Sequence, residues 1–243
     1  MWTTNGHDDR LIDYIYETDS KRKRRLGARK EMIQEIDLKC QSNELKEYID
    51  RFPDARVLVI GDIIMDKYIW GNVSRISPEA PVPVVEIKQE TKRLGGAANV
   101  INNIISLGGQ ASLCGVVGDD DTGRDLIDKI KDMQLQTDGI IVDPGRHTSI
   151  KTRVVAHNQQ VVRFDRETRK EIDPENIEKL LGFIKQRIDS IDAIIVADYG
   201  KGAISSRLMK GVRGLIIDSS IILAVDPKTD NFEYYQGSDI ITT

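Results

Sequence analysis

The chain has 243 residues, enough for one large domain or for one domain with a sizeable extension. Hydrophobic residues make up 40% and charged residues 30% of it, which excludes collagen-like and wholly disordered sequences. The net charge of −4 provides no chain-wide positive field for a nucleic-acid backbone or an anionic membrane, so we expect neither as a partner. Any anionic ligand has to be held by a local cluster of cations.

A membrane span and a secretory signal are not expected either. No apolar run approaches the roughly 18 residues of a membrane helix. The longest candidate, 215–225, is interrupted by Asp218, Ser219 and Ser220. The N-terminal residues lack the basic and apolar regions of a secretory signal. We therefore expect a cytoplasmic protein whose two cysteines, Cys40 and Cys114, are free thiols.

Residues 1–54 differ from the rest of the chain. They carry 11 basic and 12 acidic residues, including the run Lys-Arg-Lys-Arg-Arg at 21–25, and few of their apolar positions recur at helical spacing. We predict a charged, mostly helical extension that is partly disordered at its start. The basic run is either a contact for nucleic acid or an acidic partner, or a solvated helix face, and the neighbouring acids favour the solvated face.

After residue 55, short apolar runs alternate with amphipathic segments. The pattern predicts strands at 57–60, 82–87, 149–156, 160–165, 194–197 and 221–225, and helices at 97–107, 122–133, 174–188 and 205–216. Residues 157–158 are expected to form the turn of a hairpin. Alternation of this kind predicts a mainly parallel, doubly wound α/β sheet with helices on both faces.

In such sheets ligands bind at the carboxyl ends of the strands, and Asp62 and Asp66 follow the first strand. Paired carboxylates accept hydrogen bonds from sugar hydroxyls or hold a metal, while a single aspartate also caps loops. Gly95 and Gly96 precede the helix at 97–107, so its free N–H groups and Asn99 are accessible to a ligand. These glycines form neither a dinucleotide-binding fingerprint nor a P-loop.

Two lysines also occupy strand ends. Lys201 lies between glycines shortly after the strand at 194–197, and Lys228 follows the strand at 221–225. A lysine placed in this way binds phosphate as a point charge, although Gly-Lys-Gly is also an ordinary exposed turn. Two lysines on one rim favour a ligand that carries phosphate. The acidic run at 119–121 is either a metal loop or the cap of the next helix, and the cap is the favoured interpretation, so we assign no metal ligands.

Together these motifs resemble a known family. Gly-Gly-Ala-Ala-Asn at 95–99, after an aspartate-bearing strand and before Val-Gly-Asp-Asp-Asp-Thr-Gly at 117–123, is similar to the first half of a ribokinase-type (PfkB) carbohydrate kinase. Four further segments resemble the heptose 7-phosphate kinase branch of this family. They are Ser-Arg-Ile-Ser-Pro-Glu-Ala-Pro at 74–81, Asn-Gln-Gln at 158–160, Asp-Tyr-Gly-Lys-Gly at 198–202 and Asp-Pro-Lys at 226–228. The resemblance covers residues 56–243, and the segment at 74–81 is its most specific part.

The resemblance implies a ribokinase-like domain at 55–243 that is incomplete at its C-terminal side, with a small β lid at about 73–90 and 148–165. It implies the following site residues: Asp62, Asp66, Gly95, Gly96 and Asn99 for the sugar, Gln159 and Arg163 for its hydroxyls or phosphate, and Lys201 and Lys228 for the nucleotide phosphates. The implied reaction uses ATP and Mg²⁺ to phosphorylate the anomeric hydroxyl of D-glycero-D-manno-heptose 7-phosphate. Its product, the 1,7-bisphosphate, leads to ADP-heptose and the lipopolysaccharide core. The lid of such kinases often makes a homodimer.

Two further motifs of the family, Pro-Asn-x-x-Glu and Gly-Ala-Gly-Asp, do not occur in the sequence. In the family they organise Mg²⁺ and supply the catalytic base and an anion hole. We therefore expect the base beyond Thr243 and little activity from this chain alone, because phosphoryl transfer depends on positioning and charge stabilisation. The alternatives are another PfkB sugar kinase, a non-catalytic sugar-phosphate binding protein, and one half of a split kinase.

Overall fold

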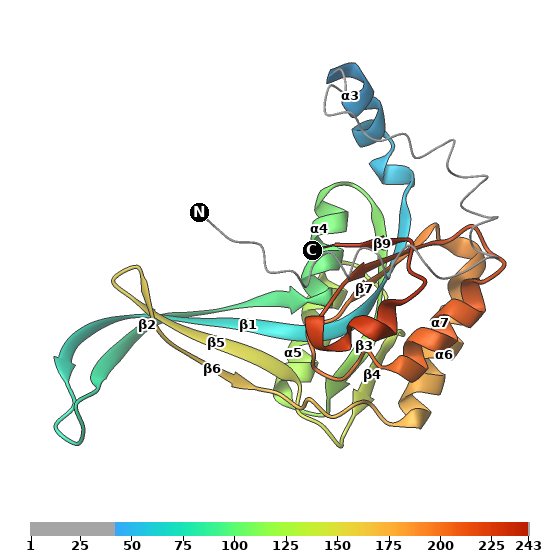
Figure 1. Cartoon of the computed structure of the whole chain (residues 1–243). Helices are drawn as coiled ribbons and strands as arrows, with labels where there is room; N and C mark the ends of the chain where they lie inside the picture. The colour runs from blue at the N-terminus through green and yellow to red at the C-terminus, as the bar shows by residue number, and fades with distance from the viewer. Residues whose placement is uncertain (1–41, 243) are drawn as a thin grey trace, which may run out of the picture.

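The computed structural model describes residues 42–242 (Figure 1). Most of the predicted extension, including the basic run at 21–25 and Cys40, therefore lies outside the described residues. Its last part forms the helix α3 (Ser42–Asp50) and the 3-10 helix η1 (Phe52–Asp54), which lead into the first strand. Within residues 42–242, no helix is long and apolar enough to cross a membrane.

The remaining elements alternate between strand and helix. In chain order they are β1 (Arg56–Ile76), β2 (Pro83–Gly96), α4 (Ala97–Ser106), β3 (Gln110–Gly118), α5 (Asp121–Asp132), β4 (Ile140–Asp143), β5 (Ser149–Ala156), β6 (Gln159–Arg166), α6 (Pro174–Arg187), η2 (Ile188–Ser190), β7 (Ala193–Ala197), α7 (Ser206–Ile216), β8 (Ile222–Asp226), η3 (Thr229–Tyr235) and β9 (Ile240–Ile241). The predicted helices α4 to α7 are confirmed, and each of their ends lies within one residue of its expected position. Strands β3 and β4 were not among the predicted elements.

The central sheet has the strand order β4-β3-β1-β7-β8-β9, and every neighbouring pair in it is parallel. Helices α6 and α7 pack on one face, where Leu58 and Ile60 of β1 join their core. Helices α4 and α5 pack on the other face, which Val59 joins. Successive side chains of a strand point to opposite faces, so one short apolar run supplies both cores. The predicted doubly wound α/β sheet is confirmed.

Strand β1 is much longer than the predicted strand at 57–60. It continues through Asp62 and Asp66 to Ile76 and enters a second sheet, in which it pairs with β2 antiparallel and with β5 parallel. Polar residues interrupt the apolar pattern after Ile60, so the predicted strand is too short at its C-terminal end. Its backbone groups are nevertheless satisfied in the second sheet, where β1 has a strand on each side.

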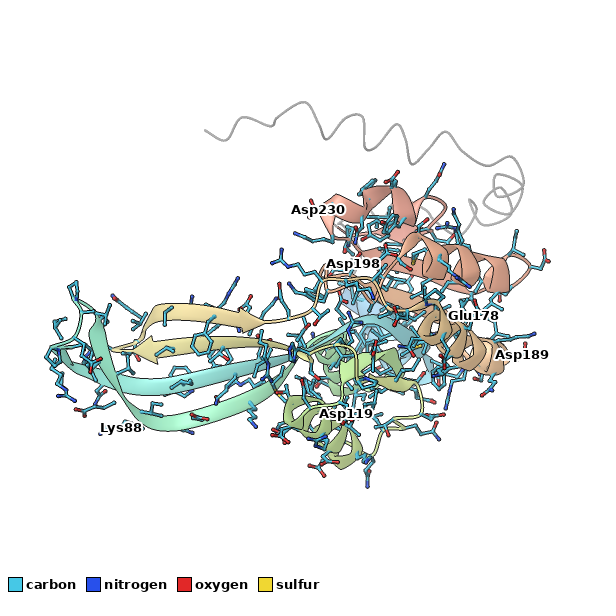
Figure 2. The ribbon with its side chains drawn as sticks, turned by 90° about the horizontal axis from the view of Figure 1, so that it is seen from below. Lys88, Asp119, Glu178, Asp189, Asp198 and Asp230 are labelled. Atoms are coloured by element: carbon cyan, nitrogen blue, oxygen red, sulfur yellow. The ribbon has the colours of Figure 1, made fainter. Side chains whose placement is uncertain are left out.

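The second sheet, in the order β2-β1-β5-β6, forms a lid that projects from the body (Figures 1 and 2). In Figure 2, Lys88 lies on the lid and Asp198 on the body. The predicted hairpin turn is confirmed, because His157 and Asn158 have φ angles of 50° and 62° and join β5 to β6. The segment 74–81, on which the resemblance chiefly rests, lies at the outer end of the lid, where β1 turns back into β2.

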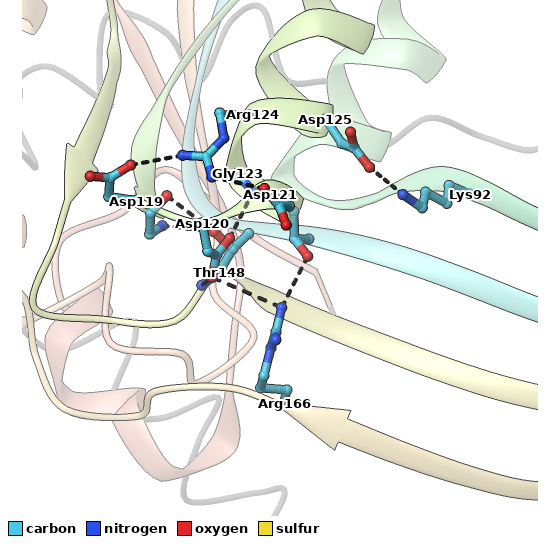
Figure 3. Close-up of polar contacts among 11 residues, drawn as sticks. Lys92, Asp119, Asp120, Asp121, Gly123, Arg124, Asp125, Thr148 and Arg166 are labelled. Atoms are coloured by element: carbon cyan, nitrogen blue, oxygen red, sulfur yellow. Dashed lines mark hydrogen bonds and ion pairs between the residues drawn. The ribbon is translucent and has the colours of Figure 1, made fainter.

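Polar contacts tie the lid to helix α5 (Figure 3). Lys92 of β2 pairs with Asp125 of α5, and Arg166 at the end of β6 donates a hydrogen bond of 3.1 Å to Thr122. Asp120 caps α5 by accepting from the N–H of Gly123 at 2.9 Å, which confirms the predicted capping role of the acidic run. Exposed pairs of this kind are each worth up to about 1 kcal/mol, so together they orient the lid more than they stabilise the fold.

At Gly61, strand β1 passes very close to β7. A Cβ atom at this position would lie 2.2 Å from the carbonyl oxygen of Ala197. Such a contact is shorter than any van der Waals approach, and both atoms belong to strands held between neighbours. Glycine is therefore required at the point where β1 leaves the central sheet.

This close approach predicts that Gly61→Ala lowers the free energy of unfolding by about 1–3 kcal/mol, because the extra methyl group forces the two strands apart. Gly214→Ala is the matched control. Gly214 lies in α7 with open space where its Cβ would be. The helix propensity of alanine should stabilise that variant by roughly 0.5–1 kcal/mol. Urea unfolding of both variants measures the difference, and equal stability of the two would contradict the close packing at Gly61.

Candidate active site

The carboxyl ends of β7 and β8 face the root of the lid across a pocket of about 590 Å³. The pocket is rich in charged side chains from both parts of the molecule. Its lining comprises Lys151, Arg163, Asp165, Arg169, Glu171, Asp198, Tyr199, Gly200, Lys201, Gly202, Ile204, Asp226, Pro227, Lys228, Asp230 and Asn231. Of the predicted site residues, it brings together Arg163, Lys201 and Lys228.

Asp62 lies beneath the loop that forms one wall of this pocket. Its carboxylate is 2% exposed and accepts hydrogen bonds from the N–H groups of Tyr199, Lys201 and Ala203, at 2.8, 3.0 and 3.1 Å. Burial raises the pKa of Asp62 above its ordinary value, although these hydrogen bonds oppose the shift. The carboxylate thus shapes the loop, and its contact with a ligand, predicted from the sequence, stays a prediction.

Asp66, which lies four residues further along β1, is more accessible than Asp62. Its carboxylate forms an ion pair with Arg153 of β5, and the side chains of the two residues are 23% and 22% exposed. It also lies against Gly95, where a Cβ atom would be 2.3 Å from Oδ2 of Asp66. Glycine at this position therefore makes room for the carboxylate itself. The predicted neighbours Asp66 and Gly95 do come together.

Gly96 and Asn99 lie at the start of α4, next to Asp66 and Gly95. Gly96 has a φ of 56°, and a Cβ atom there would lie 2.3 Å from the carbonyl oxygen of Asp62. No side chain caps the helix at this position. Its first N–H groups therefore have no partner within the helix, and Asn99 is exposed one turn in. These residues lie beyond the lining of the main pocket.

Gln159 is the predicted residue that the fold places furthest from this cluster. It pairs with Ala156 next to the hairpin turn, at the opposite end of β6 from Arg166. Arg163, by contrast, lies midway along β6 opposite Arg153 and forms an ion pair with Asp165 at 3.2 Å. The hairpin register thus separates two residues that the sequence analysis had grouped.

The loop from Asp198 to Gly202 has an unusually well-satisfied backbone. Asp198 is buried and accepts hydrogen bonds from the N–H of Gly200 at 2.7 Å and from the side-chain amide of Asn231 at 2.8 Å. The buried hydroxyl of Tyr235 also donates to Asp198. Burial raises the pKa of Tyr235 above its ordinary value, and this hydrogen bond adds to the increase. Gly200 and Gly202 have φ angles of 68° and 86°, which glycine adopts without strain.

Lys201 projects from this loop into the pocket and is held by a residue that the sequence analysis missed. Its ammonium lies 2.6 Å from Glu167, which also pairs with Arg169 at 2.6 Å. Arg146 supports the same region by donating to the carbonyl oxygens of Lys170 and Lys201, at 3.0 and 3.1 Å. Glu167 directly follows β6, which is a lid strand, and Arg146 lies between β4 and β5, whereas the predicted phosphate ligands were sought at the ends of the central strands.

Lys228 and Lys151 approach the loop from two sides. The aliphatic stem of Lys228 packs over Gly200, where a Cβ atom would meet its carbons at 3.4–3.7 Å. The ammonium of Lys151 lies 5.5 Å from the centre of the Tyr199 ring, within the range of a cation–π contact. Lys151 was also missed, because it belongs to a lid strand and not to the end of a central strand. The lining of the pocket thus combines five basic side chains with five acidic ones.

Comparison with known families matches residues 54–212 to the pfkB family of carbohydrate kinases. This match covers well over half of the chain. The chain belongs to the PfkB family. The resemblance predicted from the glycine and aspartate motifs is therefore confirmed. The matched residues include Asp62 and Asp66 of β1, the glycines at 95–96 and the loop of Lys201.

Curated relatives agree with this PfkB assignment. The bifunctional protein HldE of Helicobacter acinonychis is 43% identical over 187 residues, which are 77% of this chain and 40% of that protein. HldE of Desulfatibacillum aliphaticivorans is 43% identical over 194 residues, which are 80% of this chain and 40% of that protein. The aligned part of the chain thus spans about 40% of the length of the curated relatives that it matches.

Solved PfkB-like structures establish the fold. A carbohydrate kinase from Agrobacterium tumefaciens matches with a TM-score of 0.57 at 15% identity, over 77% of this chain and 60% of that one. Ribokinase from Giardia lamblia matches with a TM-score of 0.55 at 15% identity, over 77% of this chain and 61% of that one. The predicted ribokinase-like fold is confirmed by these neighbours.

The position of Asp62 predicts that Asp62→Asn loosens the loop, because an amide presents two donors where three N–H groups need acceptors. We expect a loss of about 2–3 kcal/mol in the free energy of unfolding. Amide hydrogen exchange at Tyr199, Lys201 and Ala203 should also become faster. Asp125→Asn, which removes an exposed ion pair with Lys92, is the control and should cost at most about 1 kcal/mol. Unchanged exchange in Asp62→Asn would show that the loop does not depend on this carboxylate.

Proposed function

We propose that this chain carries the sugar-binding part of an ATP-dependent kinase for D-glycero-D-manno-heptose 7-phosphate. The reaction moves the γ-phosphoryl group of ATP to the anomeric hydroxyl and yields the 1,7-bisphosphate. The observation that carries this proposal is the charged pocket of a PfkB chain, which lies between the lid and the carboxyl ends of β7 and β8. We place the reaction in the cytoplasm, where ATP is supplied.

The sugar is proposed to bind at the root of the lid, around Asp66. An ionised carboxylate accepts two hydrogen bonds from neighbouring hydroxyls, and Gly95 allows it to lie at the surface of the strand pair. Asn99 and the uncapped N–H groups of α4 add donors next to it. Arg153 neutralises Asp66 in the ligand-free site, so a sugar phosphate is expected to compete for this arginine.

The phosphate groups are proposed to bind around Lys201 and Lys228. These lysines line the same pocket from the ends of two neighbouring strands, with Arg163 facing them from the lid. Fixed positive charge near a transferring phosphoryl group stabilises the charge that develops on its oxygens. The heptose branch is supported by the segment at 74–81 and by the two curated relatives described above, both of which are named HldE.

Closure of the lid is proposed to exclude water from the pocket. The lid and the loop of Lys201 enclose the pocket from different sides, so a small rotation of the lid shields the phosphates. Such shielding strengthens every ionic contact inside and limits hydrolysis of ATP.

Mg²⁺ is proposed to accompany ATP, as it does in kinases generally. Within residues 42–242, no group of three or more acidic, histidine or cysteine side chains gathers closely enough to hold a metal ion. We therefore assign no residue of the described part to Mg²⁺, and none to the catalytic base. The second candidate function, a non-catalytic sugar-phosphate binding protein, shares the same pocket and lacks turnover.

Calorimetric titration with heptose 7-phosphate, then with Mg-ATP, tests the proposal, and a coupled ADP-release assay on the same sample separates its two forms. We expect the sugar phosphate to bind. Sugar-dependent ADP release would mean that this chain is a kinase by itself, whereas binding without release is the result expected both of the sugar-binding part of a kinase and of the non-catalytic alternative. Stronger binding of ribose or fructose 6-phosphate would instead favour another PfkB sugar kinase, and failure of every sugar to bind would contradict the proposed site.

The two subsites predict opposite effects of two variants. Asp66→Ala should weaken sugar-phosphate binding by about tenfold or more, because it removes a charged hydrogen-bond acceptor. It should leave binding of Mg-ATP unchanged. Lys228→Ala should weaken binding of Mg-ATP by a similar factor and spare the sugar. Titration of both variants with both ligands measures the split, and the reverse pattern would exchange the subsites.

The lid is also proposed to form a homodimer. Its surface exposes large apolar side chains that the fold leaves uncovered: Trp70, Ile76, Val82, Ile87, Val161, Val162 and Phe164. Several large apolar side chains exposed on one small sheet favour an interface. Sedimentation velocity should give the mass of a dimer for the wild-type chain and that of a monomer for Phe164→Lys. A monomeric wild-type chain at micromolar concentration would contradict this proposal.

A further inference from the structure

Glu167 stands out among the charged residues around the pocket. Its carboxylate bridges two cations, Lys201 through Oε2 and Arg169 through Oε1, each at 2.6 Å. The side chains of Glu167 and Lys201 are 11% and 12% exposed, which makes theirs the most buried ion pair among the described residues. Neither a strand-end motif nor the family resemblance had singled out this glutamate.

Burying an ion pair is expensive, because both groups lose their hydration. Burial alone would raise the pKa of Glu167, but the hydrogen bonds and charges of Lys201 and Arg169 outweigh it and hold that pKa below its ordinary value. The carboxylate is therefore ionised at neutral pH. Exposed lysines of this chain, such as Lys179, pair with acidic residues at the surface, where an ion pair contributes little to stability.

The backbone on both sides of the pair is fixed. The N–H of Lys201 donates to Asp62 at 3.0 Å, and its carbonyl oxygen accepts from Arg146 at 3.1 Å. Glu167 follows directly after β6, whose last residue, Arg166, donates to Thr122 at the start of α5. The carbonyl oxygen at Lys170 also accepts from Arg146. Since the backbone of Lys201 is held on both sides, the remaining freedom of its side chain is limited by its ion pair with Glu167.

We infer that Glu167 is the positioning residue for Lys201, and that it directs the lysine's charge toward the phosphate chain of the nucleotide. This inference rests on the proposed function, which assigns Lys201 to that phosphate chain. An ammonium has three donors, so the hydrogen bond to Glu167 leaves two for phosphate oxygens. Arg169 offsets the negative charge of Glu167, and the bridged group of Lys201, Glu167 and Arg169 therefore presents a net positive charge to the pocket.

The test uses the full chain and inorganic tripolyphosphate, which carries the phosphate chain without the adenine base. Glu167→Gln should weaken tripolyphosphate binding by about tenfold, because the lysine loses a charged hydrogen bond that orients it. In a Lys201→Met background the same change should have no further effect, since Glu167 acts through Lys201. Affinity for heptose 7-phosphate should stay the same in Glu167→Gln. That unchanged affinity also shows that the variant folds.

Glu178→Gln is the matched control, because Glu178 pairs with Arg207 at 2.9 Å on the exposed surface of α6. It should leave both affinities unchanged. If Glu167→Gln does not fold, the double variant Glu167→Gln with Lys201→Met removes both charges. Its affinity for tripolyphosphate should then equal that of Lys201→Met.

Five outcomes overturn the inference. Tighter tripolyphosphate binding in Glu167→Gln would mean that the carboxylate competes with phosphate. An equal loss of both ligands would mean a general structural role. An undiminished effect of Glu167→Gln in the Lys201→Met background would mean that Glu167 acts independently of Lys201. A wild-type chain that binds heptose 7-phosphate but no tripolyphosphate would remove Lys201 from the phosphate site and leave the sugar site standing, whereas failure to bind either ligand would overturn the proposed function as well.

Discussion

The buried carboxylate of Asp62 joins the parts of this molecule that have to meet at its site. It belongs to β1, which continues into the lid, and it accepts three hydrogen bonds from the loop that follows β7. Those N–H groups would otherwise be buried without partners, at a cost of about 1–3 kcal/mol each. The loop therefore takes a single shape, and that shape determines where Lys201 and the wall of the pocket lie.

Around the pocket, positive charges are balanced by neighbouring carboxylates. The chain as a whole is acidic, and the lining of its pocket balances five lysines and arginines with five aspartates and glutamates. Asp66 balances Arg153, and Glu167 balances Lys201 and Arg169. These ion pairs hold the cations in defined positions in the ligand-free state. A phosphorylated ligand then meets charges that are already oriented, which lowers the entropic cost of binding.

The long strand β1 belongs to both the central sheet and the lid. Its first part lies in the middle of the central sheet, packed between two hydrophobic cores, and its second part is half-exposed in the lid. Gly61 allows the close passage past β7 at the point where the strand leaves the central sheet. Because one continuous strand serves both sheets, the position of the lid relative to the central sheet is fixed through β1, which also carries Asp62 and Asp66.

Much of the fold could be predicted from local patterns. Helices α4 to α7 and strands β5 to β8 have strong periodicity, and their types and approximate bounds follow from it. Strands β3 and β4 escaped notice because β3 contains glycine, serine and cysteine and β4 is very short. The full length of β1 escaped as well, since pairing with β2 and β5 determines it and no local run of apolar residues does.

The sequence by itself determined the family, the doubly wound sheet and the strand-end residues, because these depend on periodicity and on short motifs. Only the tertiary structure decided that Asp62 lies beneath the loop while Asp66 stays accessible. The two carboxylates are four residues apart in one strand, so the strand pattern alone does not distinguish them. It also decided that Gln159 lies apart from Arg163, and that Glu167 holds Lys201 across 34 residues of sequence. Contacts between residues so distant in the chain depend on strand register and loop closure, which local sequence does not encode.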